Sequence, residues 1–146
     1  MNRVMPAIAA ALGLALAGCA SPAPRPHVDV HGAWAPVSTP GAQVGVLYAR
    51  LTSEHDDSLV SVRVSASVAD HAELHETFTE PSGRMGMRRV ASVALPARQS
   101  VAFRPGGLHI MLIGLAKPLA AGDTIAASFG FLRASPVVVR VSVRSR

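Results

Sequence analysis

The sequence predicts an all-β domain, because strand-like alternation and regularly spaced turns run through it without a helical period. In residues 60–65 valine alternates with serine or arginine, and residues 137–143 repeat the pattern. A period of two places one face of a strand in a core and the other in water. Turn-forming Gly, Pro, Asp and Ser interrupt these runs at intervals typical of sandwiches and barrels. We therefore expect a single-domain Greek-key β-sandwich or flattened barrel of about eight strands.

The individual strands are short runs rich in β-branched and apolar residues, separated by recognisable turns. Turns are expected at Pro40-Gly41, at Glu54 to Asp57, and at residues 81–83, 105–107 and 121–123. The predicted strands, in order, are Val28 to Ala35, Val44 to Leu51, Leu59 to Ser67, His71 to Thr79, Met85 to Val90, Ser100 to Phe103, His109 to Leu115, Thr124 to Leu132 and Val137 to Val143.

The N-terminus predicts export and a lipid anchor. Arg3 precedes an apolar run from Val4 to Ala17, which is too short for a membrane span of about 20 residues and is typical of a signal peptide. The run ends in Leu16-Ala17-Gly18-Cys19, which resembles the bacterial lipobox, in which the cysteine is lipid-modified. We expect a lipoprotein signal peptide over residues 1–18, a lipidated extended tether over 19–27 and the folded domain over 28–146. An ordinary secretory peptide, with Cys19 removed or left free, is the alternative.

Composition narrows the compartment and the partners. The formal charge is +5, with scattered arginines and no aromatic-lined basic stripe, so an exported chain of this kind is not expected to bind nucleic acid. With Cys19 as the sole cysteine, no internal disulfide can form. The expected location is the periplasmic face of a bacterial membrane, and Ala20 after the cysteine favours the outer membrane over the inner. Arg88 and Arg89 would either dock an acidic partner or keep an edge strand soluble.

A histidine and a methionine two residues apart suggest metal chemistry. On a strand, His109 and Met111 point to one face with Cα atoms about 6.6 Å apart. The preceding Gly106-Gly107 lets the backbone turn sharply, which would place His109 at the lip of the sheet. Thioether sulfur is a soft ligand that favours Cu(I) over Mg²⁺ or Ca²⁺. Each residue taken alone is better explained as an ordinary surface or core residue.

The wider spacing is more specific than either residue. Four candidate ligands follow one another at defined spacings: eleven residues separate His75 from Met87, twenty-one separate Met87 from His109, and one separates His109 from Met111. This pattern resembles that of the PCu(A)C periplasmic copper chaperones. The similarity extends over nearly the whole domain and is also carried by Ala33-Trp34, residues 45–52, residues 73–76 and residues 105–115. The resemblance implies a cupredoxin-like sandwich that holds one Cu(I) through His75, Met87, His109 and Met111. It also implies copper delivery to the copper-bearing subunit of cytochrome c oxidase, alongside a Sco-type thiol chaperone, by a protein expected to be a monomer.

Several alternatives stay open at this point. Met85 shares a face with Met87 and could replace it, and His27, Asp29 and His31 could hold Cu(II) or Zn²⁺ from one strand face. His71 is a distant candidate for a supporting role beside the ligands. The resemblance is incomplete, since Glu76 stands where some relatives have methionine. A second Cu(II) site at the C-terminus, which some relatives carry in a His/Met-rich tail, is not expected, because residues 144–146 hold neither residue.

The functional alternatives belong to different classes. Copper sequestration, or a non-metal adhesion or assembly lipoprotein, would each fit an exported β-sandwich. Blue-copper electron transfer requires a cysteine thiolate, which the domain lacks. No Ser/His/Asp or paired-carboxylate arrangement indicates an enzyme.

Overall fold

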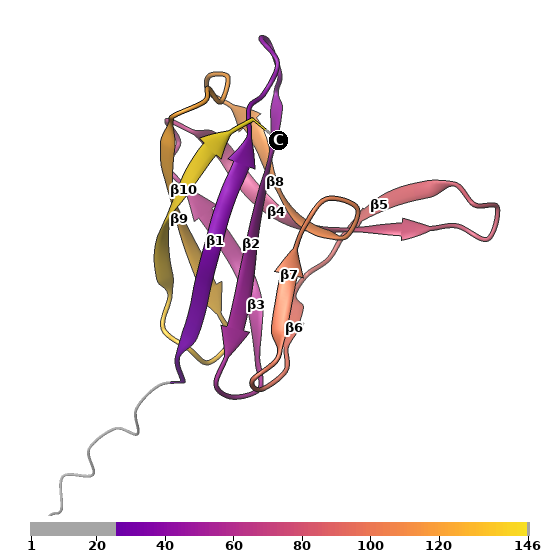
Figure 1. Ribbon diagram of the computed structural model, residues 1–146, viewed down its shortest axis with the longest axis vertical. Helices are drawn as coiled ribbons and strands as arrows, with labels where there is room; N and C mark the ends of the chain where they lie inside the picture. Colours follow the sequence, from indigo (N-terminus) through magenta and orange to yellow (C-terminus); the bar gives the residue numbers. More distant parts are fainter. Residues whose placement is uncertain (1–25, 146) are drawn as a thin grey trace, which may run out of the picture.

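The computed structural model describes residues 26–145, and this part of the chain is built from strands alone (Figure 1). Within it there is no helix long and apolar enough to cross a bilayer. The ten strands are β1 (Val28–Pro36), β2 (Val44–Ser53), β3 (Asp57–Val64), β4 (Ala69–Thr79), β5 (Met85–Arg89), β6 (Val93–Leu95), β7 (Ser100–Phe103), β8 (Leu108–Leu115), β9 (Thr124–Phe131) and β10 (Val137–Arg144). The predicted signal peptide and Cys19 lie outside the described residues.

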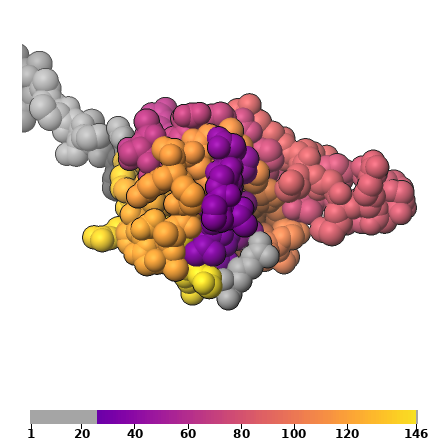
Figure 2. All heavy atoms as spheres, turned by 90° about the horizontal axis from the view of Figure 1, so that it is seen from above, coloured from indigo at the N-terminus to yellow at the C-terminus, as the bar shows by residue number. Residues whose placement is uncertain are grey.

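The strands form one continuous ladder that folds into two layers. Its order is β5-β4-β8-β7-β2-β1-β10-β9-β3-β6, with an additional pairing between β8 and β2. β1 pairs with β2 antiparallel and with β10 parallel, and so connects the two layers. β3 and β4, far apart in this order, contact each other, which brings the two layers together. The hairpin of β4 and β5 extends beyond the sandwich as an arm (Figures 1 and 2).

The core follows from the alternation along the strands. In β2 the side chains of Leu47, Ala49 and Leu51 are buried, while Val44 and Arg50 on the other face are exposed. β8 contributes Ile110 and Leu112 to the same core. Burying such aliphatic side chains stabilises the fold by about 1.5–3 kcal/mol each before entropy is counted. The outward face of β2, β8 and β4 is consequently free to carry polar and sulfur-containing side chains.

The predicted fold class is confirmed, with differences in detail. All nine predicted strands are present, and a tenth, β6, was not expected, since three residues between Ser92 and Pro96 give too short a pattern. The predicted extension of the third strand to Ser67 is wrong. A turn follows Val64, because the Ser65 carbonyl accepts hydrogen bonds from the Val68 and Ala69 amides. The predicted turn at residues 54–57 ends one residue earlier, because Asp57 is the first residue of β3.

Candidate metal centre

His75 and His109 face each other across the β4–β8 ladder. They are direct cross-strand partners, and their ring centroids lie 5.8 Å apart with the planes tilted by 40°. His109 is only 5% exposed, and the His75 side chain is 17% exposed. Nitrogen ligands lie about 2 Å from a metal, so two of them on one ion are at most about 4 Å apart. A ring-centroid separation of 5.8 Å is compatible with one ion held between the two imidazoles.

Each of these imidazoles uses one nitrogen for a structural hydrogen bond and leaves the other unpartnered. His75 Nε2 lies 2.9 Å from a Glu73 carboxylate oxygen, and His109 Nδ1 lies 2.9 Å from the Gly107 carbonyl oxygen. Because carboxylate and carbonyl oxygens only accept, these two nitrogens carry the protons. His75 Nδ1 and His109 Nε2 are buried and have no hydrogen-bond partner. Their lone pairs are the free donor atoms of the site.

The turn before β8 fixes the position of His109. Gly106 adopts a φ of +75°, a conformation that favours glycine. The Gly107 amide donates to the Arg104 carbonyl, and the Arg104 amide donates to the Leu108 carbonyl, which closes the turn. The Gly107 carbonyl also accepts from the Thr77 amide at 3.1 Å, so β4 holds the turn from the other side. The sharp turn predicted at Gly106-Gly107 is therefore present.

The two predicted methionines differ in how close the fold brings them. Met111 lies two residues from His109 on β8, opposite Glu73, and is partly buried. Met87 lies on β5 opposite Thr77, one diagonal step from His75, and is 62% exposed. Paired residues share a face, so both thioethers are on the face that carries the histidines. The fold thus groups His75, His109 and Met111 closely, with Met87 on the adjoining arm.

Met85 is the more remote of the two methionines on the arm. It pairs with Thr79, one two-residue repeat nearer the hairpin tip than Met87, which adds about 6.8 Å along the strand. It is 63% exposed, and with Met87, Thr77 and Gly106 it lines a shallow hollow beside the turn. Register therefore favours Met87 over Met85 as the thioether nearer to His75.

Glu73 organises the polar surroundings of His75. One of its oxygens is 2.9 Å from His75 Nε2, and the other is 3.4 Å from His71 and 3.5 Å from Arg89. The hydrogen bond from His75 holds the pKa of Glu73 below its ordinary value, against the opposing effect of desolvation, and Arg89 and His71 act in the same direction as His75. A carboxylate that orients a ligating histidine in this way is common behind metal sites.

The two arginines next to Met87 are engaged within the arm. Arg88 pairs with Glu76 and lies over the Phe78 ring, and Arg89 lies near Glu73. Phe78 in turn covers Gly86, where a Cβ would stand 2.7 Å from the ring. These contacts lie on the face of the arm opposite Met87, apart from Arg89. They stabilise the arm. Because the Arg88 guanidinium is already paired with Glu76, it is not free to dock an acidic partner.

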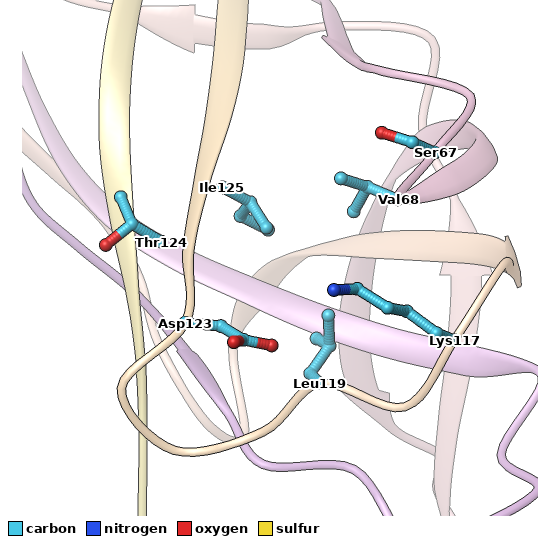
Figure 3. Close-up of a pocket in the computed structure, with 7 residues that line it drawn as sticks. All are labelled: Ser67, Val68, Lys117, Leu119, Asp123, Thr124 and Ile125. Atoms are coloured by element: carbon cyan, nitrogen blue, oxygen red, sulfur yellow. The ribbon is translucent and has the colours of Figure 1, made fainter.

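Other predicted or possible sites do not assemble in the same way. Within residues 26–145, no group of three or more His, Cys, Asp or Glu side chains could hold a metal ion, so the hypothetical Cu(II) or Zn²⁺ site at His27, Asp29 and His31 is wrong. His27 instead pairs with Asp29 at 3.0 Å on the surface. The lining of a separate pocket includes Lys117 and Asp123 but no histidine or methionine (Figure 3).

Two features of the site were not anticipated from the sequence. Glu73 was noted only as part of a motif, although its spacing of two from His75 on a strand already places both on one face. The second feature, the Gly107 carbonyl that fixes the His109 tautomer, is a backbone group and has no sequence signal of its own.

The fold is that of PCuAC domains. The chain superposes on the apo PCuAC domain from PmoF1 with a TM-score of 0.68 and 22% identity, covering 82% of this chain and 94% of that one. It superposes on the Cu(I) form of DR1885 from Deinococcus radiodurans with a TM-score of 0.60 and 26% identity, covering 80% and 79% of the two chains. The predicted resemblance to the PCu(A)C family is confirmed.

The chain belongs to the family described as "Putative lipoprotein LpqE-like", whose model matches residues 28–143. A relative from Leifsonia xyli subsp. xyli, named "Putative lipoprotein", is 30% identical over 144 residues and aligns with 92% of this chain and 86% of its own length.

Proposed function

We propose that this protein is an exported copper chaperone that binds one Cu(I) through His75 Nδ1, His109 Nε2 and the sulfurs of Met111 and Met87. The observation that carries the proposal is the pair of buried imidazole nitrogens without a hydrogen-bond partner. Leaving such an atom desolvated costs about 1–3 kcal/mol, so a ligand that uses the lone pairs of two facing histidines would offset that cost. Soft thioethers beside them favour Cu(I).

The exposure of the arm suits transfer of the metal rather than permanent storage. The histidines are held by Glu73 and Gly107, whereas Met87 lies 62% exposed on a hairpin that projects from the sandwich (Figure 2). A thioether that dissociates first would open one coordination position to an incoming ligand. The likeness to DR1885, solved with Cu(I), supports copper as the cargo. We further propose that the acceptors include the copper-bearing subunit of cytochrome c oxidase and that the protein acts there alongside a Sco-type thiol chaperone.

The family and the N-terminal sequence support an exported, lipid-anchored location. The related chains are named lipoproteins, and Cys19 ends a lipobox-like segment ahead of the matched residues. We propose that residues 1–18 are removed, that Cys19 is lipidated, and that residues 19–27 tether the domain to the periplasmic face of a membrane, the outer one in preference. The domain would act there as a monomeric binding protein rather than an enzyme.

Titration of the full chain with Cu(I) against a competing chelator tests the proposal. We expect one equivalent bound more tightly than about 1 µM, and loss of that binding in the His109→Ala, Met111→Ala double variant. Met87→Ala should weaken binding roughly tenfold. Met85→Ala, its matched control on the same strand and face, should change it by less than about twofold. Absence of binding, or unchanged binding in the double variant, would sink the proposal. A larger effect of Met85→Ala would reassign the fourth ligand.

A further inference from the structure

A second hollow lies on the same outward face of the sheet, lined by arginines. It is bordered by Trp34 of β1, Arg50 of β2, Arg104 and Pro105 after β7, and Arg144 at the end of β10. Its lining contains no aspartate or glutamate. Arg104 and Pro105 belong to the turn that positions His109, so this basic hollow directly adjoins the candidate metal centre.

A bulge in β1 assembles the hollow. The register of the β1–β2 pairing changes between two pairs: His31 lies opposite Arg50, and Trp34 lies opposite Tyr48. Three steps along β1 therefore match two along β2, so His31 and Trp34 point to one face instead of opposite faces. Gly32, with a φ of +61°, allows the extra residue. The bulge thus places Trp34 on the face that carries Arg50, where both line the hollow.

Strand register also places the hollow and the candidate metal centre on one surface. Tyr48 shares its face with Val46, and Val46 pairs with Met111. Trp34 is therefore two strands from Met111 and one two-residue repeat along, roughly 12 Å between Cα atoms. A protein surface that covered one of these sites would also reach the other.

The arginines of the hollow are free to bind an anion. On the arm, Arg84, Arg88 and Arg89 each lie against a glutamate. By contrast, Arg50, Arg104 and Arg144 make no ion pair within residues 26–145. The Arg144 guanidinium lies over the Trp34 ring, 4.7 Å from its centroid, which leaves its edge able to donate hydrogen bonds. Three such groups around one concavity suit carboxylates, which guanidinium binds in bidentate fashion.

We propose that the basic hollow binds a carboxylate-bearing segment of the protein that exchanges copper with this chain. The proposal rests on the proposed function for the identity of that partner, and on charge complementarity and the shared face for the docking. Contact at the arginines would hold the partner while a ligand is exchanged at the histidines and Met87. Charged contacts of this kind mainly raise the rate of association and fix orientation.

The single tryptophan of the chain offers a direct readout, since Trp34 lines the hollow. We would titrate the full chain at low salt with a blocked oligoglutamate peptide and follow tryptophan fluorescence. An oligoglutamine peptide of equal length, inorganic phosphate and phosphatidylglycerol vesicles serve as comparison ligands. Saturable binding of oligoglutamate, at lower concentration than phosphate and without binding of oligoglutamine, is the expected result.

Matched variants separate the hollow from general positive charge. The triple variant Arg50→Gln, Arg104→Gln, Arg144→Gln should lose at least about tenfold in oligoglutamate affinity. The triple Arg63→Gln, Arg133→Gln, Arg140→Gln removes the same charge from exposed arginines outside the hollow and should lose no more than about twofold. Because Arg144 lies on the fluorophore, the double variant Arg50→Gln, Arg104→Gln provides a second comparison with an undisturbed indole, and it should lose at least about threefold.

The outcomes are distinct. Equal losses in the two triples, no saturable change with oligoglutamate, or vesicles binding the wild type more tightly than the peptide would each overturn the docking proposal. Cu(I) titration of the same proteins should give one affinity throughout, because Arg104 closes the turn before His109 through its backbone amide and carbonyl, which the substitution keeps. If the wild type bound oligoglutamate but no Cu(I), the proposed function would fail and the carboxylate site would stand without a copper partner. If Cu(I) bound and oligoglutamate did not, the docking proposal alone would fail.

Discussion

Asp57 and His109 are both buried polar side chains, and they differ in how completely the fold satisfies them. Asp57 is 7% exposed and accepts hydrogen bonds from the amides of Ser58, Arg133 and Ala134 at 2.7, 3.0 and 2.8 Å. His109 is 5% exposed, and its Nε2 has no hydrogen-bond partner. The Asp57 carboxylate connects the start of β3 to the loop after β9. The His109 imidazole uses only Nδ1, which bonds to the Gly107 carbonyl.

The difference distinguishes a polar group whose hydrogen bonds the fold satisfies from one that keeps a lone pair available. A buried charge is tolerated when backbone donors surround it, and Asp57 gains stability from that arrangement. A buried nitrogen left unpaired lowers stability, and the second such nitrogen on His75 supports the binding role proposed for the pair. Removing Asp57 should therefore affect folding and spare copper binding, while removing the histidines should do the reverse.

The largest expected effect is on copper affinity in the His75→Leu, His109→Leu double variant. Loss of a residue that merely supports a metal ligand costs about 10–100-fold in affinity, so loss of two ligands should cost at least about a thousandfold, about 4 kcal/mol. The free energy of unfolding should stay within about 1 kcal/mol of the wild type, because two desolvated nitrogens disappear. The Gly107 carbonyl keeps its bond from the Thr77 amide.

Competition titration with Cu(I) and urea unfolding of the metal-free protein measure these two quantities. His27→Leu, His55→Leu is the control, since both of its histidines are exposed. Retained copper affinity would dismiss the histidine pair as the site. A loss of several kcal/mol in stability would show that the pair is structural after all.

Asp57→Ala should have the next largest effect, this time on stability. Three amides lose a charged acceptor in a buried position, which we expect to lower the free energy of unfolding by about 3 kcal/mol. Copper affinity should change by less than about twofold. Urea unfolding gives the first value and Cu(I) competition the second. Asp29→Ala, which removes a carboxylate that is 69% exposed, should cost less than about 0.5 kcal/mol. Equal costs for the two variants would contradict the structural role of Asp57.

These two regions also show what the sequence can and cannot predict. The pairing of His75 with His109 depends on register between strands distant in the chain, yet the spacing of the four candidate ligands and their family resemblance indicated it. Asp57 was assigned to a turn, because nothing near it in sequence reveals that the amides of Arg133 and Ala134 converge on it. The Gly32 bulge was equally hidden, since glycine in a strand does not say which neighbours it brings onto one face.

The smallest effect we expect is a pH dependence of the Asp57 contribution. Burial raises the pKa of the Asp57 carboxyl, but the hydrogen bonds from Ser58, Ala134 and Arg133 outweigh it and hold the pKa below the ordinary value of 3.8. With a depressed pKa in the folded state, the unfolded chain takes up the proton first as the pH falls. The stabilisation is therefore complete above about pH 5 and is lost as the pH falls through the folded-state value.

Urea unfolding of wild type and Asp57→Ala from about pH 6 to about pH 2.5 measures this contribution. The difference in unfolding free energy between the two proteins should narrow toward the acid end, because a protonated carboxyl accepts the three amides less strongly. Glu73, whose pKa is also lowered, is present in both proteins and cancels in the difference. A difference that stays constant with pH would mean that shape and packing, not the ionised carboxylate, hold the loop after β9 to β3.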